Sequence, residues 1–394
     1  MKKGNDRQTG VVIIGSDFQA LGAIRGFTEN NIPTYLIEHE VGISRFSRYV
    51  KRREKRFMLN LKSDDFPEKL IEIAKRENLK GWMLFPNSDK IVELLSIHRD
   101  QLKDWYKIPI PSWETVQKYY FKNNAYQIAK ELSIPIPRMY HAQNVDDLLS
   151  QDLNFPLVLK PTYKDDYFPV TKKKAVQVNN KQDLKREYLK MSSIIENKHI
   201  VIQEMIMGGT KNLYSFVSFF NGSNVVAGIS ARRLRQHPMD FGHASTYAVS
   251  IVNTELRNMA EKILKKIGYY GISEVEFMKD DKDGKFKFIE INGRVWGWHT
   301  LAKASGIDLP TILFHHVNGL EINIAEPQAG VKWIRLVTDV PTVINELFSG
   351  RMHIRDYFES IKGKKEYAVF SLKDPLPFFM EILFIPYLWW KRGY

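Results

Sequence analysis

Residues 276–294 read Glu-Phe-Met-Lys-Asp-Asp-Lys-Asp-Gly-Lys-Phe-Lys-Phe-Ile-Glu-Ile-Asn-Gly-Arg, two strand-like runs joined by the Asp- and Gly-containing segment that tight turns prefer. A turn centred on Asp283 places Glu276 directly opposite Glu290, with the two side chains about 5 Å apart on one face. Two half-buried carboxylates at that separation repel each other and need a cation between them. Asn292 offers a carbonyl oxygen on the same face. This all-oxygen ligand set predicts Mg²⁺ or Mn²⁺ and disfavours zinc.

Arg294 lies two residues beyond Asn292 and therefore on the same face of the strand. A guanidinium held beside a metal stabilises a phosphate or a tetrahedral oxyanion. An alternative stays open, in which the glutamates are ordinary solvent-facing residues of an exposed strand. A slip of one residue in the pairing would put Glu276 and Glu290 on opposite faces.

The chain has 394 residues, of which 44% are hydrophobic, and this is enough for two or three folded cores. It contains no cysteine, which excludes disulfides, thiolate metal centres and a cysteine nucleophile and fits a cytoplasmic protein. The net charge of +13 fits nucleic acid, an anionic membrane surface or phosphorylated ligands. Because no recognisable nucleic-acid module accompanies the basic residues, we expect no nucleic-acid partner.

Residues 1–110 alternate apolar runs with helix-like stretches, which predicts an open parallel α/β domain. Ser88 and Asp89 follow its third strand at the carboxyl end, where ligands bind in such sheets, so both are substrate candidates. Their alternative role is to cap the helix that follows. The strands are predicted at 11–14, 34–37 and 81–85.

Residues 111–320 have the pattern of an α+β region, and residues 321–394 form a C-terminal extension. The chain is therefore expected to be a multidomain α/β and α+β protein. Short strands are predicted at 157–160, 175–178, 200–204, 213–220 and 225–230, followed by a helix at 255–267 and the hairpin.

Four motifs occur in an order that resembles a known family. They are Val-Glu-Phe around Glu276 with Glu-Ile-Asn-Gly-Arg at 290–294, Lys122 in Phe-Lys-Asn-Asn, Lys160 in Leu-Val-Leu-Lys-Pro, and Val-Ile-Gln-Glu-Met-Ile at 201–206. Together they resemble the ATP-grasp superfamily of carboxylate-amine ligases, and most closely the subgroup that includes D-aspartate ligases. The two lysines match the family's phosphate-contacting lysines.

The resemblance implies an ATP-grasp fold over residues 111–320, in which two α+β subdomains clasp ATP around a hinge near residues 203–206. It also implies that Gln203, Glu204 and Ile206 lie at the adenine. Mg²⁺ or Mn²⁺ would be held by the carboxylates of the hairpin, beside the phosphates.

Two features depart from the family pattern. Residues 162–171 contain no glycine, whereas many members cover the phosphates there with a glycine-rich loop. Lys174 and the two lysines before it compensate by charge, or else form a solvated hairpin tip. Residues 208–212 lack the usual ribose-binding carboxylate, for which Asn212 or Thr210 is the best substitute.

Arg233 and Arg235 follow a predicted strand, on the stretch where the family keeps a basic residue near the triphosphate. We expect one of them to contact the γ-phosphate or the acceptor carboxylate. The loop-like run 242–245, with His243 and Ser245, would border the substrate. A surface arginine cluster is the competing explanation.

The C-terminal residues 375–394 begin with a strongly apolar and aromatic run, residues 375–390, which Lys391 and Arg392 follow directly. Glu381 and Pro386 interrupt the run, which is shorter than the roughly 20 residues of a spanning helix. Peripheral contact with an anionic membrane, on its cytoplasmic face, explains this composition. Docking on the protein's own core or on a homodimer partner explains it equally well.

These features predict an ATP-dependent ligase that joins a small-molecule carboxylate to an amine through an acyl-phosphate and releases ADP and phosphate. Arg294, with Arg233 or Arg235, would act as the catalytic cation. The alternative is a non-catalytic ATP-binding regulatory or scaffold protein, which the two departures favour and the intact metal ligands disfavour. A carboxylase that uses bicarbonate would share the same ATP site.

Overall fold

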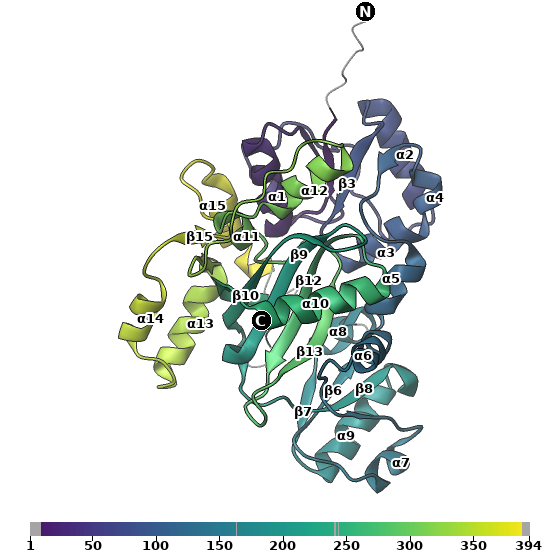
Figure 1. Ribbon diagram of the computed structural model, residues 1–394, viewed down its shortest axis with the longest axis vertical. Helices are drawn as coiled ribbons and strands as arrows, with labels where there is room; N and C mark the ends of the chain where they lie inside the picture. The colour runs from purple at the N-terminus through teal and green to yellow at the C-terminus, as the bar shows by residue number, and fades with distance from the viewer. Residues whose placement is uncertain (1–8, 163, 240–241, 243, 388–394) are drawn as a thin grey trace, which may run out of the picture.

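The computed structural model describes residues 9–162, 164–239, 242 and 244–387. Three β-sheets organise these residues along the long axis of the molecule (Figure 1). A four-stranded N-terminal sheet lies at one end, a second four-stranded sheet lies at the other, and a seven-stranded sheet lies between them.

The N-terminal sheet is parallel throughout and has the strand order β2-β1-β3-β4. Its first three strands are buried along their whole length, as expected where helices cover both faces. The predicted parallel α/β domain is therefore confirmed. Its elements are β1 (Val11–Ile14), α1 (Phe18–Glu29), β2 (Thr34–Ile37), the 3₁₀ turn Ser44–Phe46, α2 (Phe66–Glu77), β3 (Trp82–Pro86), α3 (Asp89–Ile97), α4 (Arg99–Leu102) and β4 (Tyr106–Lys107).

The second four-stranded sheet is antiparallel, with the order β5-β8-β6-β7 and a hydrophobic core of its own. Helices α5 (Trp113–Tyr120) and α6 (Lys122–Glu131) precede it. Its elements are β5 (Met139–Tyr140), α7 (Val145–Ser150), β6 (Leu157–Pro161), α8 (Lys164–Thr171), β7 (Val176–Val178), α9 (Lys181–Ser192), the 3₁₀ turn Asn197–His199 and β8 (Ile200–Glu204).

The seven-stranded sheet has the order β13-β12-β9-β10-β11-β14-β15. Helix α10 packs on β9 and β10 over one core, and α12 packs on the same two strands over another. The elements are the 3₁₀ turn Thr210–Asn212, β9 (Leu213–Phe220), β10 (Val225–His237), β11 (Ala244–Ile251), α10 (Thr254–Ile267), β12 (Gly271–Lys279), β13 (Phe286–Asn292), α11 (Thr300–Ala304), α12 (Leu309–Val317), β14 (Lys332–Ile334) and β15 (Lys365–Tyr367).

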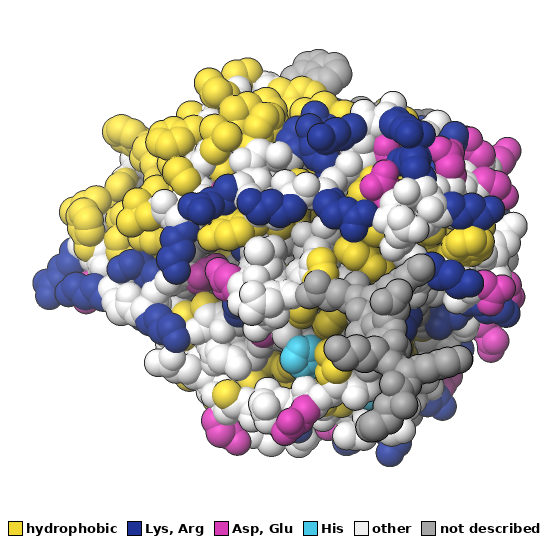
Figure 2. All heavy atoms as spheres, turned by 90° about the horizontal axis from the view of Figure 1, so that it is seen from above, with side chains coloured by type: hydrophobic (Ala, Val, Ile, Leu, Met, Phe, Trp, Pro, Cys, Tyr) yellow, Lys and Arg dark blue, Asp and Glu magenta, His cyan; other side chains and the backbone are white. Residues whose placement is uncertain are grey.

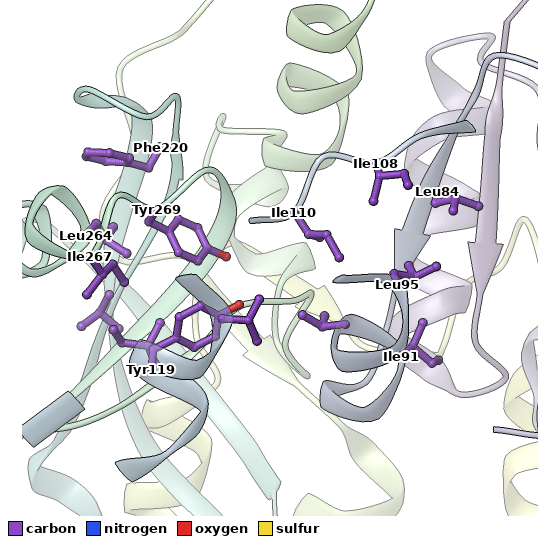
Figure 3. Close-up of a cluster of buried hydrophobic side chains, with 14 of the residues drawn as sticks. Leu84, Ile91, Leu95, Ile108, Ile110, Tyr119, Phe220, Leu264, Ile267 and Tyr269 are labelled. Atoms are coloured by element: carbon purple, nitrogen blue, oxygen red, sulfur yellow. The ribbon is translucent and has the colours of Figure 1, made fainter. Parts of the chain in front are cut away.

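One continuous core joins the N-terminal domain to the seven-stranded sheet. Figure 3 shows Leu84 and Ile91 of the N-terminal domain on one side, and Leu264 and Tyr269 from the region of α10 on the other. The rings of Tyr119 and Tyr269 meet edge to face at 5.5 Å. Because this shared core is closely packed, it fixes the carboxyl end of β3 relative to the hairpin β12–β13.

The C-terminal extension is built into the central sheet rather than appended to it. Its strands β14 and β15 extend that sheet beyond β11. Three helices of this extension lie on the left side of the molecule in Figure 1, two of them between β14 and β15 in the chain and the third after β15. They are α13 (Leu336–Phe348), α14 (Ile354–Ser360) and α15 (Leu376–Leu383).

Two local features differ from the sequence prediction. Residues 164–171 of the glycine-free stretch form the helix α8, and Lys172 follows it with a left-handed φ of 57°. Of the two alternatives for Lys172 to Lys174, the hairpin tip is excluded, because these residues connect a helix to a strand. Strand β10 also continues to His237, seven residues beyond its predicted end at Ser230, because β11 pairs with it.

Candidate active site

Beside the turn between β12 and β13, Lys279 pairs with Phe286, so the turn is centred between Lys282 and Asp283 and not on Asp283 itself as predicted. Glu276 lies opposite Glu290, and Glu274 lies opposite Asn292, on one face of the sheet. A β-bulge follows Glu276, so that Phe277 pairs with Phe288 and the partly buried Ile289 is the extra residue. The predicted pair Glu276 and Glu290 is therefore confirmed, but it is reached through a bulge that the sequence did not predict.

Gly293 separates Asn292 from Arg294 for a steric reason. A Cβ atom at this position would lie 2.2 Å from the phenolic oxygen of Tyr119. The Asn-Gly-Arg sequence thus brings the polar end of β13 tightly against α5.

Glu276 is buried and accepts two hydrogen bonds. The Asn292 Nδ2 donates to its Oε1 at 2.9 Å, and an Arg233 guanidinium nitrogen lies 2.5 Å from its Oε2. Asn292 also donates to Glu274 Oε2 at 3.1 Å. The two predicted metal ligands Glu276 and Asn292 are therefore in direct contact, and the structure brings Arg233 to them.

Glu290, the third predicted metal ligand, lies among lysines. Lys122 Nζ is 3.3 Å from its Oε2. Burial by itself would raise the pKa of Glu290, but the charges of Lys122, Lys160 and Lys174 outweigh it and hold that pKa well below its ordinary value. Lys174 also lies 3.4 Å from the carbonyl oxygen of Gly242. Glu290 is thus held as an anion among lysine side chains.

Glu274 is a carboxylate that the sequence reasoning missed. It is buried, and it accepts a hydrogen bond from Ser215 Oγ at 2.8 Å. Burial first, and then the neighbouring charge of Glu276, raise the pKa of Glu274 far above its ordinary value. The sequence did indicate that Glu274 belongs to the site, because residues two apart in a strand share a face and Glu274 precedes Glu276 by two.

The donor set of the hairpin fits a hard divalent cation. Among the described residues no group of three or more His, Cys, Asp or Glu side chains is arranged to hold a metal ion. The candidate ligands are the carboxylates of Glu276 and Glu290 and the Oδ1 of Asn292, which here accepts a hydrogen bond from Arg294. Mg²⁺ is commonly held by one or two carboxylates together with substrate phosphates and water. The lysines beside Glu290 supply the charge that such phosphates require.

Arg294 connects the hairpin to the N-terminal domain. Its guanidinium makes a two-pronged ion pair with Asp89, at 2.9 and 3.1 Å, and donates to Asn292 Oδ1 at 3.1 Å. Ser88 caps α3 by accepting from the backbone N–H of Ile91, so the capping interpretation of Ser88 is what the structure shows. Of the two substrate candidates, Ser88 and Asp89, it is Asp89 that contacts a residue of the hairpin, Arg294.

Lys160 belongs to a short hydrogen-bonded chain. Its Nζ donates to the phenolic oxygen of Tyr126 at 2.8 Å, and this hydroxyl donates to Gln203 Oε1 at 3.2 Å. Burial, and then repulsion from Lys122, lower the pKa of Lys160 to about 7. Tyr126 is a second residue that the sequence reasoning missed, because nothing in α6 sets it apart from a core tyrosine.

The predicted hinge lies at the end of β8. Glu204 Oε1 accepts from Asn154 Nδ2 at 2.9 Å and from the Tyr140 hydroxyl at 3.3 Å, and Ile206 is buried. Asn212 uses its amide to bind Asp281 Oδ1 at 2.6 Å. Asn212 therefore connects the segment after the hinge to the turn between β12 and β13. This contact also brings the carboxylate of Asp281 beside Asn212.

The two arginines of β10 have different surroundings. Arg233 meets Glu276, whereas Arg235 forms a two-pronged ion pair with Asp339 of α13, at 2.8 Å for each contact, and stacks on Tyr247. Ser245 lies in β11, where it pairs with Gln236 of β10. His243 lies outside the described residues.

Comparisons with known proteins agree with this geometry. The family described as "Carbamoyl-phosphate synthase L chain, ATP binding domain" matches residues 245–324, which include the whole hairpin. A D-aspartate ligase from Enterococcus faecium is 22% identical over 300 residues, which cover 72% of this chain and 70% of that protein.

Solved structures share the fold at low sequence identity. The biotin carboxylase domain dimer of 2-oxoglutarate carboxylase from Hydrogenobacter thermophilus, in complex with MgADP, ADP and bicarbonate, superposes with a TM-score of 0.65 and 16% identity, over 83% of this chain and 74% of that one. An L-amino acid ligase from Bacillus licheniformis superposes with a TM-score of 0.60 and 14% identity, over 79% and 75%.

The fold is therefore the ATP-grasp fold, with a parallel α/β domain ahead of it. The resemblance to the ATP-grasp superfamily that the motifs predicted is confirmed, and the D-aspartate ligase lies in the subgroup that they favoured.

Proposed function

We propose that the protein is an ATP-dependent ligase that forms an amide between a carboxylate and an amine and releases ADP and phosphate. The observation that carries the proposal is the facing pair Glu276 and Glu290, set beside lysines on one side and arginines on the other. Such a site neutralises a triphosphate and the charge that develops when a phosphoryl group moves.

Each group near the pair has a role in the proposed mechanism. Lys122 and Lys160 would bind the phosphates of ATP, and Glu276, Glu290 and Asn292 would hold Mg²⁺ or Mn²⁺. When bound, the metal neutralises phosphate charge and orients the transferred phosphoryl group.

The acceptor carboxylate would attack the γ-phosphorus of ATP, which breaks the bond to the bridging oxygen and gives an acyl-phosphate and ADP. The amine would then attack the acyl carbon, phosphate would leave with the electrons of the carbon–oxygen bond, and the nitrogen would lose a proton to the departing phosphate or to water. Arg294 and Arg233 would stabilise the oxyanion of that step with their positive charge. Asp89 would orient Arg294 through their two-pronged contact.

The names of two similar proteins, D-aspartate ligase and L-amino acid ligase, make amino acids the first substrates to test. The purified protein with MgATP is offered amino acids in pairs, and phosphate release is followed together with the mass of the product. The proposal expects phosphate release that depends on both partners, and a product whose mass equals their sum less one water.

Two variants sharpen this experiment. Glu290→Gln removes a proposed metal ligand and should lower phosphate release by about 10² to 10³. Glu255→Gln makes the same chemical change at an exposed position of α10 and should leave phosphate release unchanged. Tight nucleotide binding without phosphate release for any pair would instead support the non-catalytic alternative.

A further inference from the structure

Helix α15 exposes apolar side chains and buries its charged one, which is the reverse of an ordinary surface helix. It exposes apolar side chains at Leu376, Phe379 and Leu383, with exposed fractions of 51%, 57% and 68%. The one charged side chain within the helix, Glu381, is only 1% exposed. A soluble helix turns its apolar face inward and its charges outward, so the outer face of α15 lacks a partner within the described chain.

The inner face of α15 is firmly attached. Arg335 donates to Glu381 Oε1 through two nitrogens, at 2.9 and 2.7 Å, and Phe378 packs on the core beneath. Just before the helix, Asp374 accepts hydrogen bonds from Arg25 and Ser47. These buried contacts hold the helix in this orientation, so its exposed apolar face belongs to the fold.

Helices α13 and α14 of the same C-terminal extension also expose apolar side chains. Phe348 at the end of α13 is 90% exposed. Figure 2 shows hydrophobic side chains gathered on the left of the view, the side on which Figure 1 places α13, α14 and α15, with a row of Lys and Arg side chains along their border. We call this the C-terminal apolar surface; its exposed members are Val340, Ile344, Phe348, Ile354, Phe358, Leu372, Leu376, Phe379, Ile382, Leu383 and Tyr387.

Acidic and basic side chains of the same segment differ in their burial. Between residues 336 and 387 four of the seven acidic side chains are buried, and each lies in an ion pair with an arginine. All six basic side chains of this segment are exposed, against two exposed acidic ones. The buried acids are Asp339, Glu346, Asp374 and Glu381, the exposed acids are Asp356 and Glu359, and the exposed bases are Arg351, Arg355, Lys362, Lys364, Lys365 and Lys373.

An apolar surface bordered by basic side chains fits an anionic partner. A second copy of the chain docked through this surface would bring two basic borders together, which costs energy through like-charge repulsion. A bilayer that contains anionic lipid matches both properties, because its hydrocarbon accepts Phe and Leu side chains while its headgroups attract Lys and Arg.

We propose that the C-terminal apolar surface docks on an anionic lipid bilayer, with α15 lying in the plane of the interface. Among the described residues no helix is long and apolar enough to cross a membrane, and the proposed contact is peripheral. The inference goes beyond ligation and does not depend on the identity of the substrates.

The test is co-sedimentation of the full-length protein with vesicles of phosphatidylcholine alone or with 30% phosphatidylglycerol. The protein is expected to pellet with the anionic vesicles, and to do so less at high salt because screening weakens the attraction. The double variant Phe379→Ser/Leu383→Ser should lower the partition coefficient at least tenfold. A matched control, Leu189→Ser/Val252→Ser, removes two exposed apolar side chains elsewhere and should bind as the wild type does.

A second pair of measurements separates charge from apolar contact and from self-association. Lys364→Gln/Lys365→Gln should reduce binding to the anionic vesicles, and unchanged circular dichroism checks that each variant is folded. Wild-type protein that stays in the supernatant with both vesicle types overturns the proposal, as does equal binding to neutral and anionic vesicles. Dimerisation in analytical ultracentrifugation that Phe379→Ser/Leu383→Ser abolishes, without vesicle binding, identifies a second copy as the occupant and overturns it as well.

Discussion

The affinity of the protein for nucleotide should fall steeply as the pH rises, because the charge on Lys160 is easily lost. The free protein holds the pKa of Lys160 at about 7, and a triphosphate beside this ammonium would raise that pKa strongly. Nucleotide therefore binds the protonated form. The affinity for nucleotide is therefore fully present below pH 7, and it is lost as the pH rises from there towards the higher pKa that Lys160 has in the nucleotide complex.

The expected magnitude follows from the protonated fraction. With a pKa of about 7, roughly a quarter of the Lys160 side chains are charged at pH 7.5 and about one in a hundred at pH 9. The dissociation constant should rise by roughly 25-fold over this range, which corresponds to about 1.9 kcal/mol. The phosphates of ATP are fully ionised throughout the range and do not contribute a change of their own.

Isothermal titration calorimetry with ATP between pH 7.5 and pH 9, in buffers of different ionisation enthalpy, measures both the affinity and the proton uptake. Lys160→Met should bind more weakly and lose most of the pH dependence. Lys130→Met, which removes an exposed lysine of α6, should keep the wild-type profile. A wild-type affinity that changes less than about threefold, without proton uptake, would refute the reasoning.

Three further outcomes are expected. Glu290→Gln should lower the turnover number by about 10² to 10³, read from phosphate release once a substrate pair is known. Arg294→Lys should lower it by at least about tenfold, because a lysine cannot reproduce the two-pronged contact with Asp89, and a fully active variant would contradict this role. Glu381→Leu should lower the free energy of unfolding in urea by about 3–5 kcal/mol, because it leaves Arg335 buried without its partner. Replacing both with apolar residues, as in Arg335→Met/Glu381→Leu, should recover most of that loss, and equal stability of the two variants would contradict the account.

The hairpin could be predicted from the sequence because its determinants are local. The turn at Asp280 to Gly284 pairs Lys279 with Phe286. The pair Glu276 and Glu290, which the residue count predicts, then forms because a β-bulge at Ile289 adds one residue to β13. The parallel N-terminal sheet followed from short apolar runs for the same reason. The alternation of side chains along β12 also predicts that Glu274 lies on the face of Glu276. Glu274 was missed because it lies outside the motif that matches the family.

The partners of the remaining site residues depend on contacts between distant segments. Arg235 and Arg233 look alike in the sequence, yet Asp339, 104 residues further on, engages Arg235 and leaves Arg233 to the carboxylates. Asp89 meets Arg294 across 205 residues through the shared core. Such pairings depend on how the helices and sheets pack, which residue spacing does not encode.

The most direct test of the proposed chemistry follows the oxygen atoms of the acceptor. Once a substrate pair is found, its carboxylate is labelled with ¹⁸O and the released phosphate is analysed by mass spectrometry. Activation through an acyl-phosphate transfers one carboxylate oxygen to phosphate in each turnover, with ADP as the other product. Unlabelled phosphate, or the formation of AMP and pyrophosphate, would contradict the account.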